Sequence, residues 1–326
     1  MSESATVNCF AGAGIETEWD NPVAPAYYFN WLTPGESLSS HREYAFNETM
    51  DGQIQSREPS LDLTYWDGSL NGELTYDGHE ILLRALMGAV GESDPVGGGE
   101  DPVVWTFSPS VGPIGTSIYM NRDAKLYKYS GGKCTGATFT FGGGPVCMVS
   151  YDFLGGTMAS DTVEVRADKT FYTYNPVKRV NASSSITLGS TPAEIKAYLT
   201  QATINVSNER TKESTIFAST IIEPQFSGKQ KITGSMTGWM SADAYTNIGA
   251  DFEGGEDSGI VITLAGAGDL EYVFTMESCY LGPTGDPNAS SGGLVQCTWP
   301  FWAWYDGTND GLTIKVTHNT STNYFA

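Results

Sequence analysis

Gly68-Ser69-Leu70-Asn71-Gly72 and Gly234-Ser235-Met236-Thr237-Gly238 are two similar pentapeptides that lie 166 residues apart. Further landmarks occur in the same order in both halves of the chain. At that offset Leu38 matches Ile204, Glu43 matches Glu209 and Asp77 matches Asp243; Glu58-Pro59 matches Glu223-Pro224 one residue off, and Cys134 and Cys147 correspond to Cys279 and Cys297. A collinear series across most of both halves predicts an internal duplication.

The composition indicates that each copy is rich in β-strands. The 326 residues include 38 glycines, together with many Thr, Ser and Tyr, and these residues favour short strands joined by turns. Apolar residues make up 40% of the chain, and 8 Trp, 17 Tyr and 14 Phe are enough for two packed cores. We therefore predict a mainly β fold of two tandem β-sandwich or barrel-like domains, each with a flanking α-helix.

Local patterns place several elements. Asp67-Gly68 is typical of a hairpin turn and predicts two strands, at about 60–66 and 69–75. Asp77 and Glu80 have the spacing of a capping box, which predicts a helix over 77–90 that Gly91 ends. We expect His79, in the first turn of that helix, to be an ordinary surface residue. Strands are also expected at 126–130, 134–141 and 146–153, and again at 261–264, 271–276 and 295–304.

Two predicted strands present a long polar face. Over 37–51 the odd positions are polar except for Ala45, while several even positions are apolar, and 203–213 shows the same alternation at its start. The side chains expected to face water in both copies are Glu43, Asn47, Asp51, Glu209 and Glu213. This face is therefore expected to be uncharged to acidic.

The N-terminal 35 residues form a predicted extended arm. Asn21-Pro22, Ala24-Pro25 and Thr33-Pro34-Gly35 each disfavour helix. An arm with this many apolar side chains must dock on a protein surface, and we expect that surface to belong to an adjacent subunit or ring. The aromatic residues expected to make this contact are Trp19, Tyr27, Tyr28, Phe29 and Trp31. The predicted organisation is thus an arm over 1–35, a first domain over 36–175 and a second domain over 176–326.

The charge disfavours nucleic-acid binding. Seventeen basic residues against 38 acidic ones give a net charge of -21, the wrong sign for neutralising phosphates. The first ten residues have neither the basic start nor the apolar core of a secretory signal, so we expect a cytosolic origin. Cys134 and Cys147 are expected to be small buried residues, and a bond between Cys279 and Cys297 is left open.

The sequence contains no recognisable catalytic, metal-binding or phosphate-binding motif. The three histidines show no spacing for a metal site or a catalytic dyad, and no phosphate-binding glycine loop, serine-hydrolase or zinc-protease motif occurs. The stretch from Asp306 to Gly311 resembles the start of a calcium loop but has Thr at the third and twelfth positions, so we expect a turn. We predict a protein that is not an enzyme and that has no metal site and no cofactor.

The first half resembles the tail tube proteins of long-tailed (siphovirus-like) bacteriophages, in particular the two-unit type. The resemblance rests on the ordered stretches 14–19 with Pro22, 35–39, 68–74, 77–90, 125–134 and 149–155, and the second half joins it through the internal repeat. It implies a virion protein assembled in the host cytoplasm, whose three copies form a ring of six units. Stacked rings would make a hollow tube around a lumen lined by the five polar side chains above, and DNA would pass through it without specific binding.

The same resemblance implies partners and leaves one alternative. Besides further copies of the chain, a tape measure protein and tail terminator or tip proteins are expected to contact the tube. The alternative is a carbohydrate-binding or adhesin-like double β-sandwich, which Trp299, Trp302 and Trp304 would serve if they were exposed. Such a module would remain a monomer and bind a sugar, whereas a tube subunit would have edge strands that bind other copies.

Overall fold

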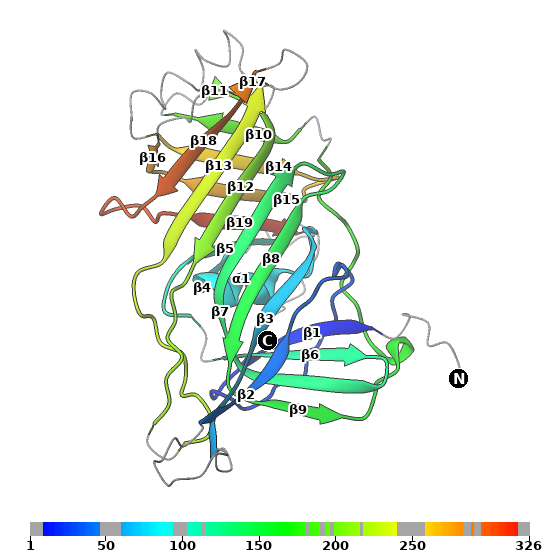
Figure 1. Ribbon diagram of the computed structural model, residues 1–326. Helices are drawn as coiled ribbons and strands as arrows, with labels where there is room; N and C mark the ends of the chain where they lie inside the picture. Colours follow the sequence, from blue (N-terminus) through cyan, green and yellow to red (C-terminus); the bar gives the residue numbers. More distant parts are fainter. Residues whose placement is uncertain are drawn as a thin grey trace.

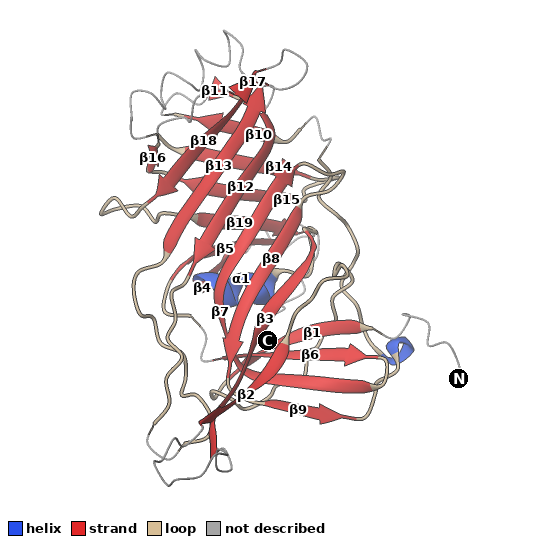
Figure 2. Cartoon of the chain, viewed as in Figure 1, coloured by secondary structure: helices blue, strands red, loops and turns tan. Residues whose placement is uncertain are grey.

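The strands of the chain form two sheets packed face to face (Figure 1). The computed structural model describes residues 9–45, 60–93, 103–112, 115–179, 183–189, 193–195, 199–215, 218–239, 258–282, 288–289 and 295–318. Figure 2 shows that strands make up most of this part of the chain, in which α1 (Glu80–Met87) is the one α-helix. The predicted mainly β fold with a flanking helix in the first half is confirmed.

The large sheet has 12 strands, eight of which form one continuous path. Their order is β16 (Cys279–Leu281), β18 (Val295–Ala303), β13 (Lys231–Trp239), β12 (Leu199–Ser207), β7 (Lys125–Gly142), β8 (Met148–Gly155), β3 (Ser60–Glu73) and β2 (Ser39–Ala45). The short β17 (Asn288–Ala289) pairs with the same edge of β18 as β16 does. The N-terminal part of β7 pairs with β6 (Gly115–Arg122) and β9 (Met158–Asp161), and β6 in turn pairs with β1 (Phe10–Glu16).

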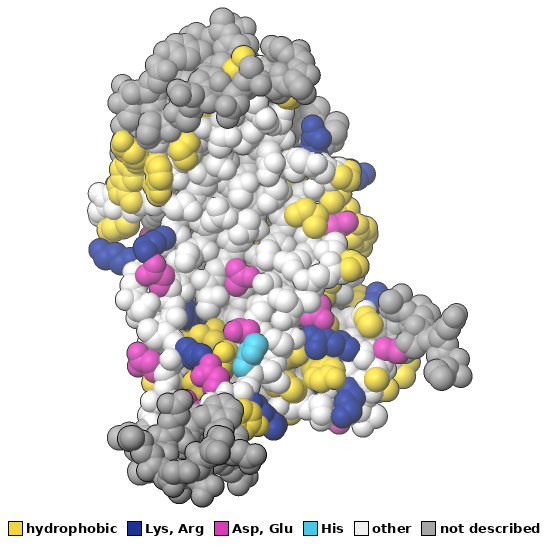
Figure 3. All heavy atoms as spheres, viewed as in Figure 1, with side chains coloured by type: hydrophobic (Ala, Val, Ile, Leu, Met, Phe, Trp, Pro, Cys, Tyr) yellow, Lys and Arg dark blue, Asp and Glu magenta, His cyan; other side chains and the backbone are white. Residues whose placement is uncertain are grey.

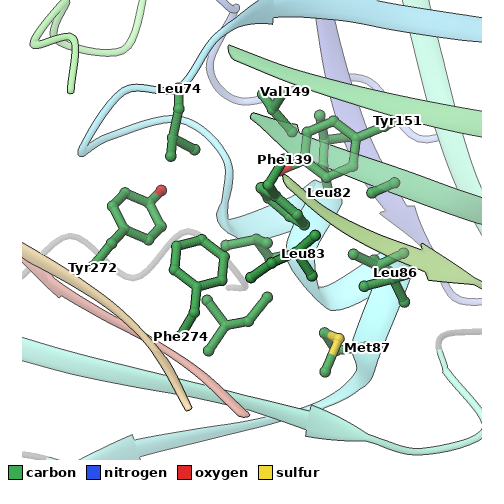
Figure 4. Packing of buried hydrophobic residues seen from close by; sticks show 14 of the residues in the cluster. Leu74, Leu82, Leu83, Leu86, Met87, Phe139, Val149, Tyr151, Tyr272 and Phe274 are labelled. Atoms are coloured by element: carbon green, nitrogen blue, oxygen red, sulfur yellow. The ribbon is translucent and has the colours of Figure 1, made fainter. Parts of the chain in front are cut away.

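The small sheet has seven strands and covers one face of the large one. Its order is β11 (Ala193–Glu194), β10 (Ser185–Leu188), β14 (Ile260–Ala265), β15 (Glu271–Met276), β19 (Thr313–His318), β5 (Val103–Pro109) and β4 (Gly88–Ser93). Helix α1 lies beside it on the same face. Figure 4 shows the resulting core: Leu82, Leu83 and Leu86 of α1 pack among rings of the large sheet and of β15. The rings of Phe139 and Phe274 meet edge to face at 5.1 Å across the two layers.

The two halves of the chain share both sheets and one core. In the large sheet β7 pairs with β12, and in the small sheet β5 pairs with β19. One buried cluster contains residues from Ala11 to Val316. The described strands of the two halves thus share one packed interior, and the domain boundary between 175 and 176 stays a prediction.

Three local predictions differ from the structure. The predicted hairpin at Asp67-Gly68 is one continuous strand, because Gly68 has a φ of 136° and β3 changes its edge neighbour there from β2 to the segment 31–37. The strands expected at 126–130 and 134–141 are one strand, β7, which bends at Gly131 with a φ of 66°. The helix begins at Glu80 and ends at Met87, and Asp77 does not cap it: a carboxylate oxygen of Asp77 accepts a hydrogen bond from the Thr173 amide at 2.9 Å.

Candidate functional site: an uncovered sheet face with two open edges

No described helix or second sheet covers the face of the large sheet that points away from the small sheet, which we call the uncovered face although the connection after β12 crosses it beside β3; Figure 3 looks onto it. Alternation along the strands sends apolar side chains such as Phe139 and Ile204 into the core, so their neighbours point outward. Most outward residues in the middle of the face carry hydroxyl or amide groups: Thr138, Thr140, Ser150, Thr203, Asn205, Thr233, Ser235, Thr237 and Thr298. Apart from the exposed Asp152 of β8, the centre of this face is thus largely neutral and polar, which agrees with its broad white area in Figure 3.

The strand path ends in two open edges. At one end β2 pairs only with β3, and at the other β16 and β17 pair only with β18 among the described residues. An open edge presents unpaired N–H and C=O groups to any strand that reaches it. The chain therefore carries two different sites for adding a strand, at opposite ends of one sheet.

The junction of β7 with β12 shows how two such edges join inside the chain. The strands are antiparallel in seven consecutive pairs, from Gln201 opposite Gly142 to Ser207 opposite Gly136. Gly136 allows a close approach, since a Cβ there would lie 2.8 Å from the carbonyl oxygen of Val206. On the uncovered face the Thr138 hydroxyl donates to Asn205 Oδ1 at 3.0 Å.

The pairing registers repeat along the path. In β2 and β3, Ser39 lies opposite Asp67; in β12 and β13, Asn205 lies opposite Thr233, and both residues are 166 positions further on. The pairing of β3 with β8 corresponds to that of β13 with β18. Leu70 lies opposite Tyr151, and Met236, which is 166 positions further on, lies opposite Trp299. The set β2-β3-β8-β7 thus has the same order as β12-β13-β18-β16.

This register corrects one landmark of the sequence comparison. Gly72 lies opposite Val149 and Gly238 opposite Cys297, so Cys297 takes the place of Val149 rather than of Cys147. The cysteine correspondence is therefore two residues off. All five cysteines are free thiols, and those other than Cys9 are buried. Burial raises the pKa of the Cys134 thiol to about 12, as expected for an inert core residue.

The acidic residues predicted to line a polar face are in part neutralised by lysines. Lys212 Nζ lies 2.6 Å from Glu43 Oε1, and this ion pair lowers the pKa of the Glu43 carboxyl and raises that of the Lys212 ammonium. Glu209 forms an ion pair with Lys231. Glu213 is exposed beyond the end of β12, and Asn47 and Asp51 lie outside the described residues.

The predicted arm packs on its own chain. Tyr28, Phe29 and Trp31 are buried, and Trp31 stacks on His79 with ring centroids 4.3 Å apart. Tyr27 is half-buried beside Tyr172, and Trp19 Nε1 donates to the Gly131 carbonyl at 3.0 Å. Within the described chain these rings contact residues of their own chain, and their binding to an adjacent subunit stays a prediction.

The tryptophan cluster of the second half is divided between the two sides of β18. Trp299 is buried in the core, whereas Trp302 and Trp304 are exposed together with Tyr280 of β16. Alternation along the sequence places Trp302 on the outward side of β18. That Trp302 lies opposite Tyr280 depends on the register between β16 and β18, which cannot be predicted from the sequence.

The loop that resembles a calcium site is a turn. Asp306 Oδ1 accepts hydrogen bonds from the amides of Thr308 and Asn309, both at 2.7 Å, and these bonds lower the pKa of its carboxyl to about 2. Within the described ranges no group of three or more His, Cys, Asp or Glu is arranged to hold a metal ion. No helix in that same part of the chain is long and apolar enough to cross a membrane.

Comparison with known proteins gives one result. A search of curated proteins found no match. A family described as "Phage tail tube protein" matches residues 6–303, which is nearly the whole chain, and it is a family of structural proteins rather than of enzymes. This match agrees with the mainly β fold and with the resemblance seen in the sequence. The chain therefore belongs to the phage tail tube protein family and is a structural component of the virion tail.

Proposed function

We propose that three copies of this chain close into a ring of six quasi-equivalent halves, and that stacked rings form a tube through which DNA leaves the virion. The observation that carries the proposal is the repeated strand order, β2-β3-β8-β7 followed by β12-β13-β18-β16, with one register in both sets. The proposal takes the two halves to be copies of one unit.

The junction of β7 with β12 serves as the template for the contact between copies. In the second set β16 takes the place of β7, and in the first set β2 takes the place of β12. The β2 edge of one copy then pairs with the β16 edge of the next. Two different patches in contact make a heterologous interface, which closes into a ring when the rotation allows it. Closure would satisfy both open edges of the large sheet.

The uncovered face supplies the wall of the lumen. Its central hydroxyl and amide groups carry no charge, so they neither attract nor strongly repel a phosphate backbone. The lysines near Glu43 and Glu209 are held in ion pairs, which leaves little free positive charge for DNA. DNA then slides past without specific binding. The tape measure and the tail terminator or tip proteins are the further partners we propose, and assembly takes place in the host cytoplasm.

Electron microscopy and mass measurement of the purified protein test this function. We expect rings with three chains each, and tubes of such rings at high concentration. A protein that stays monomeric at all concentrations, with no ring in assembled tails, contradicts the proposal. If that monomer also bound an oligosaccharide, the carbohydrate-binding alternative would take its place.

A further inference from the structure

An aromatic patch lies on the uncovered face at the β16 edge. Tyr280 of β16 and Trp302 of β18 are directly opposite one another, with ring centroids 6.0 Å apart. They are 46% and 44% exposed, and hydrophobic side chains gather at this end of the sheet in Figure 3. Large aromatic side chains that lie together on an open sheet edge indicate an interaction surface.

The corresponding position in the first half is covered. Trp302 lies opposite Thr233 and Tyr280, while Leu154 lies opposite Asp67 and Lys133. Leu154 therefore takes the place of Trp302, and Lys133 takes that of Tyr280. Yet Leu154 is only 9% exposed and Lys133 only 4%, so the same place in the fold is buried in one half and open in the other.

The cover of the first-half patch comes from the second half. The connection between β12 and β13, residues 208–230, crosses the junction and reaches β3, where the Thr64 amide donates to the Ser219 carbonyl at 2.7 Å. Ile221 on this connection packs with Leu63 and Leu154. Glu223 Oε1 lies 2.6 Å from Lys133 Nζ. The connection that follows β12 thus seals the patch on the neighbouring set of strands.

We propose that the Tyr280–Trp302 patch is covered in the same way by a second copy of this chain, through Tyr44 of its β2 and Leu61 of its β3, which border the connection between these strands. This inference rests on the proposed function, because it needs the β2 edge of the second copy next to β16. The described ends of that connection are apolar and open: Tyr44 and Leu61 lie opposite one another and are 51% and 47% exposed.

The position of these two surfaces explains why they do not meet within one chain. Tyr44 and Leu61 lie at the β2 end of the sheet, and Tyr280 and Trp302 lie at the β16 end. Neither surface therefore covers the other within one chain. The junction inside the chain contains an ion pair between Lys133 and Glu223. In the second half Tyr280 takes the place of Lys133, so the contact between copies is more apolar than the junction inside the chain.

Photo-crosslinking of the assembled protein tests the contact. Trp302 is replaced by p-benzoylphenylalanine, the protein is irradiated as rings or tubes, and the linked peptides are sequenced. We expect crosslinks between chains that map to residues 44–61 of the second copy. Crosslinks that stay within one chain, or that map to another region of the neighbour, overturn the inference even though rings are present. Absence of any ring or tube overturns the proposed function itself.

Substitutions give an independent readout. Trp302→Ser and Tyr280→Ser together should leave the thermal unfolding of the monomer near that of the wild type and raise the concentration for half-maximal ring formation at least tenfold. Val165→Ser is the control, because Val165 is also exposed but follows β9, which pairs with β7 and belongs to neither open edge. Ring formation by the double variant at the wild-type concentration contradicts the inference.

Discussion

The protonation state of the His79 imidazole is determined by the residues that pack around it. The side chain is fully buried between Trp31 and Tyr151, and its Nε2 lies 3.2 Å from the Thr75 amide nitrogen. Burial lowers the pKa of the imidazole from 6.5 to about 4, so it stays neutral in the folded chain. The sequence places His79 near a helix start, where a surface position was expected, and nothing in its neighbours along the chain reveals the stacking on Trp31.

A pH dependence of stability follows from this burial. The pKa of His79 is lower in the folded chain than in the unfolded one, so the free energy of unfolding has its full value above pH 6.5. It decreases by about 3 kcal/mol in total as the pH falls from 6.5 toward 4. His79→Gln removes the titration and keeps an acceptor for the Thr75 amide. Urea unfolding at several pH values should therefore give a shallower slope for the variant between pH 6.5 and 4. Equal slopes for both proteins would show that His79 does not stay neutral.

The ion pairs of Glu43 and Glu209 lead to a second prediction at this scale. Glu43→Lys together with Glu209→Lys puts like charges beside Lys212 and Lys231. Each ring would then carry several new cations on the proposed lumen wall, and affinity for a polyanion rises steeply with the number of phosphates neutralised. Assembled tubes of the variant should retain labelled duplex DNA in low salt and release it in high salt.

The control for this prediction changes the charge equally on the other sheet. Glu271→Lys with Glu277→Lys alters the small sheet, which lies away from the uncovered face. Tubes of the control should not retain DNA in their interior. Equal retention by both variants would remove the uncovered face from the lumen wall.

At the scale of the elements, β3 shows which features can be predicted from sequence. Alternation identified the strands and their buried sides, and 271–276 and 295–304 fall on β15 and β18. Asp67-Gly68 was a misleading signal, because glycine there serves a close backbone approach rather than a turn. A Cβ on Gly68 would lie 2.5 Å from the Ser37 carbonyl oxygen. Such an approach comes from a segment 30 or so positions away in sequence, so local patterns do not contain it.

Gly68→Ala tests this account of β3. The residue has a φ of 136°, and alanine there costs about 1–3 kcal/mol for the backbone alone, before the contact with Ser37. Gly307→Ala is the control, since Gly307 has a φ of 101° and no atom within 4 Å of the added Cβ. In urea unfolding, Gly68→Ala should lose more stability than Gly307→Ala. Similar losses of stability in the two variants would mean that the contact between Gly68 and Ser37 leaves room for a methyl group.

In the whole molecule the two halves of the chain share both sheets and one buried core. The offset of 166 residues seen in the sequence also relates the pairing of Ser39 with Asp67 to that of Asn205 with Thr233, while the duplication itself stays a prediction. The sharing of both sheets depends on pairings between distant segments, β7 with β12 and β5 with β19. The packing of the arm depends on other distant contacts, such as that of Trp31 with His79. Linear order alone does not distinguish pairing within a chain from pairing between chains.

Electron cryomicroscopy of the assembled tube tests the central claim most directly. The account predicts three chains in each ring, with the β2 edge of one chain paired to the β16 edge of the next and the hydroxyl-rich face turned to the lumen. A ring with another number of chains, or a tube whose inner wall is formed by the small sheet, would contradict it.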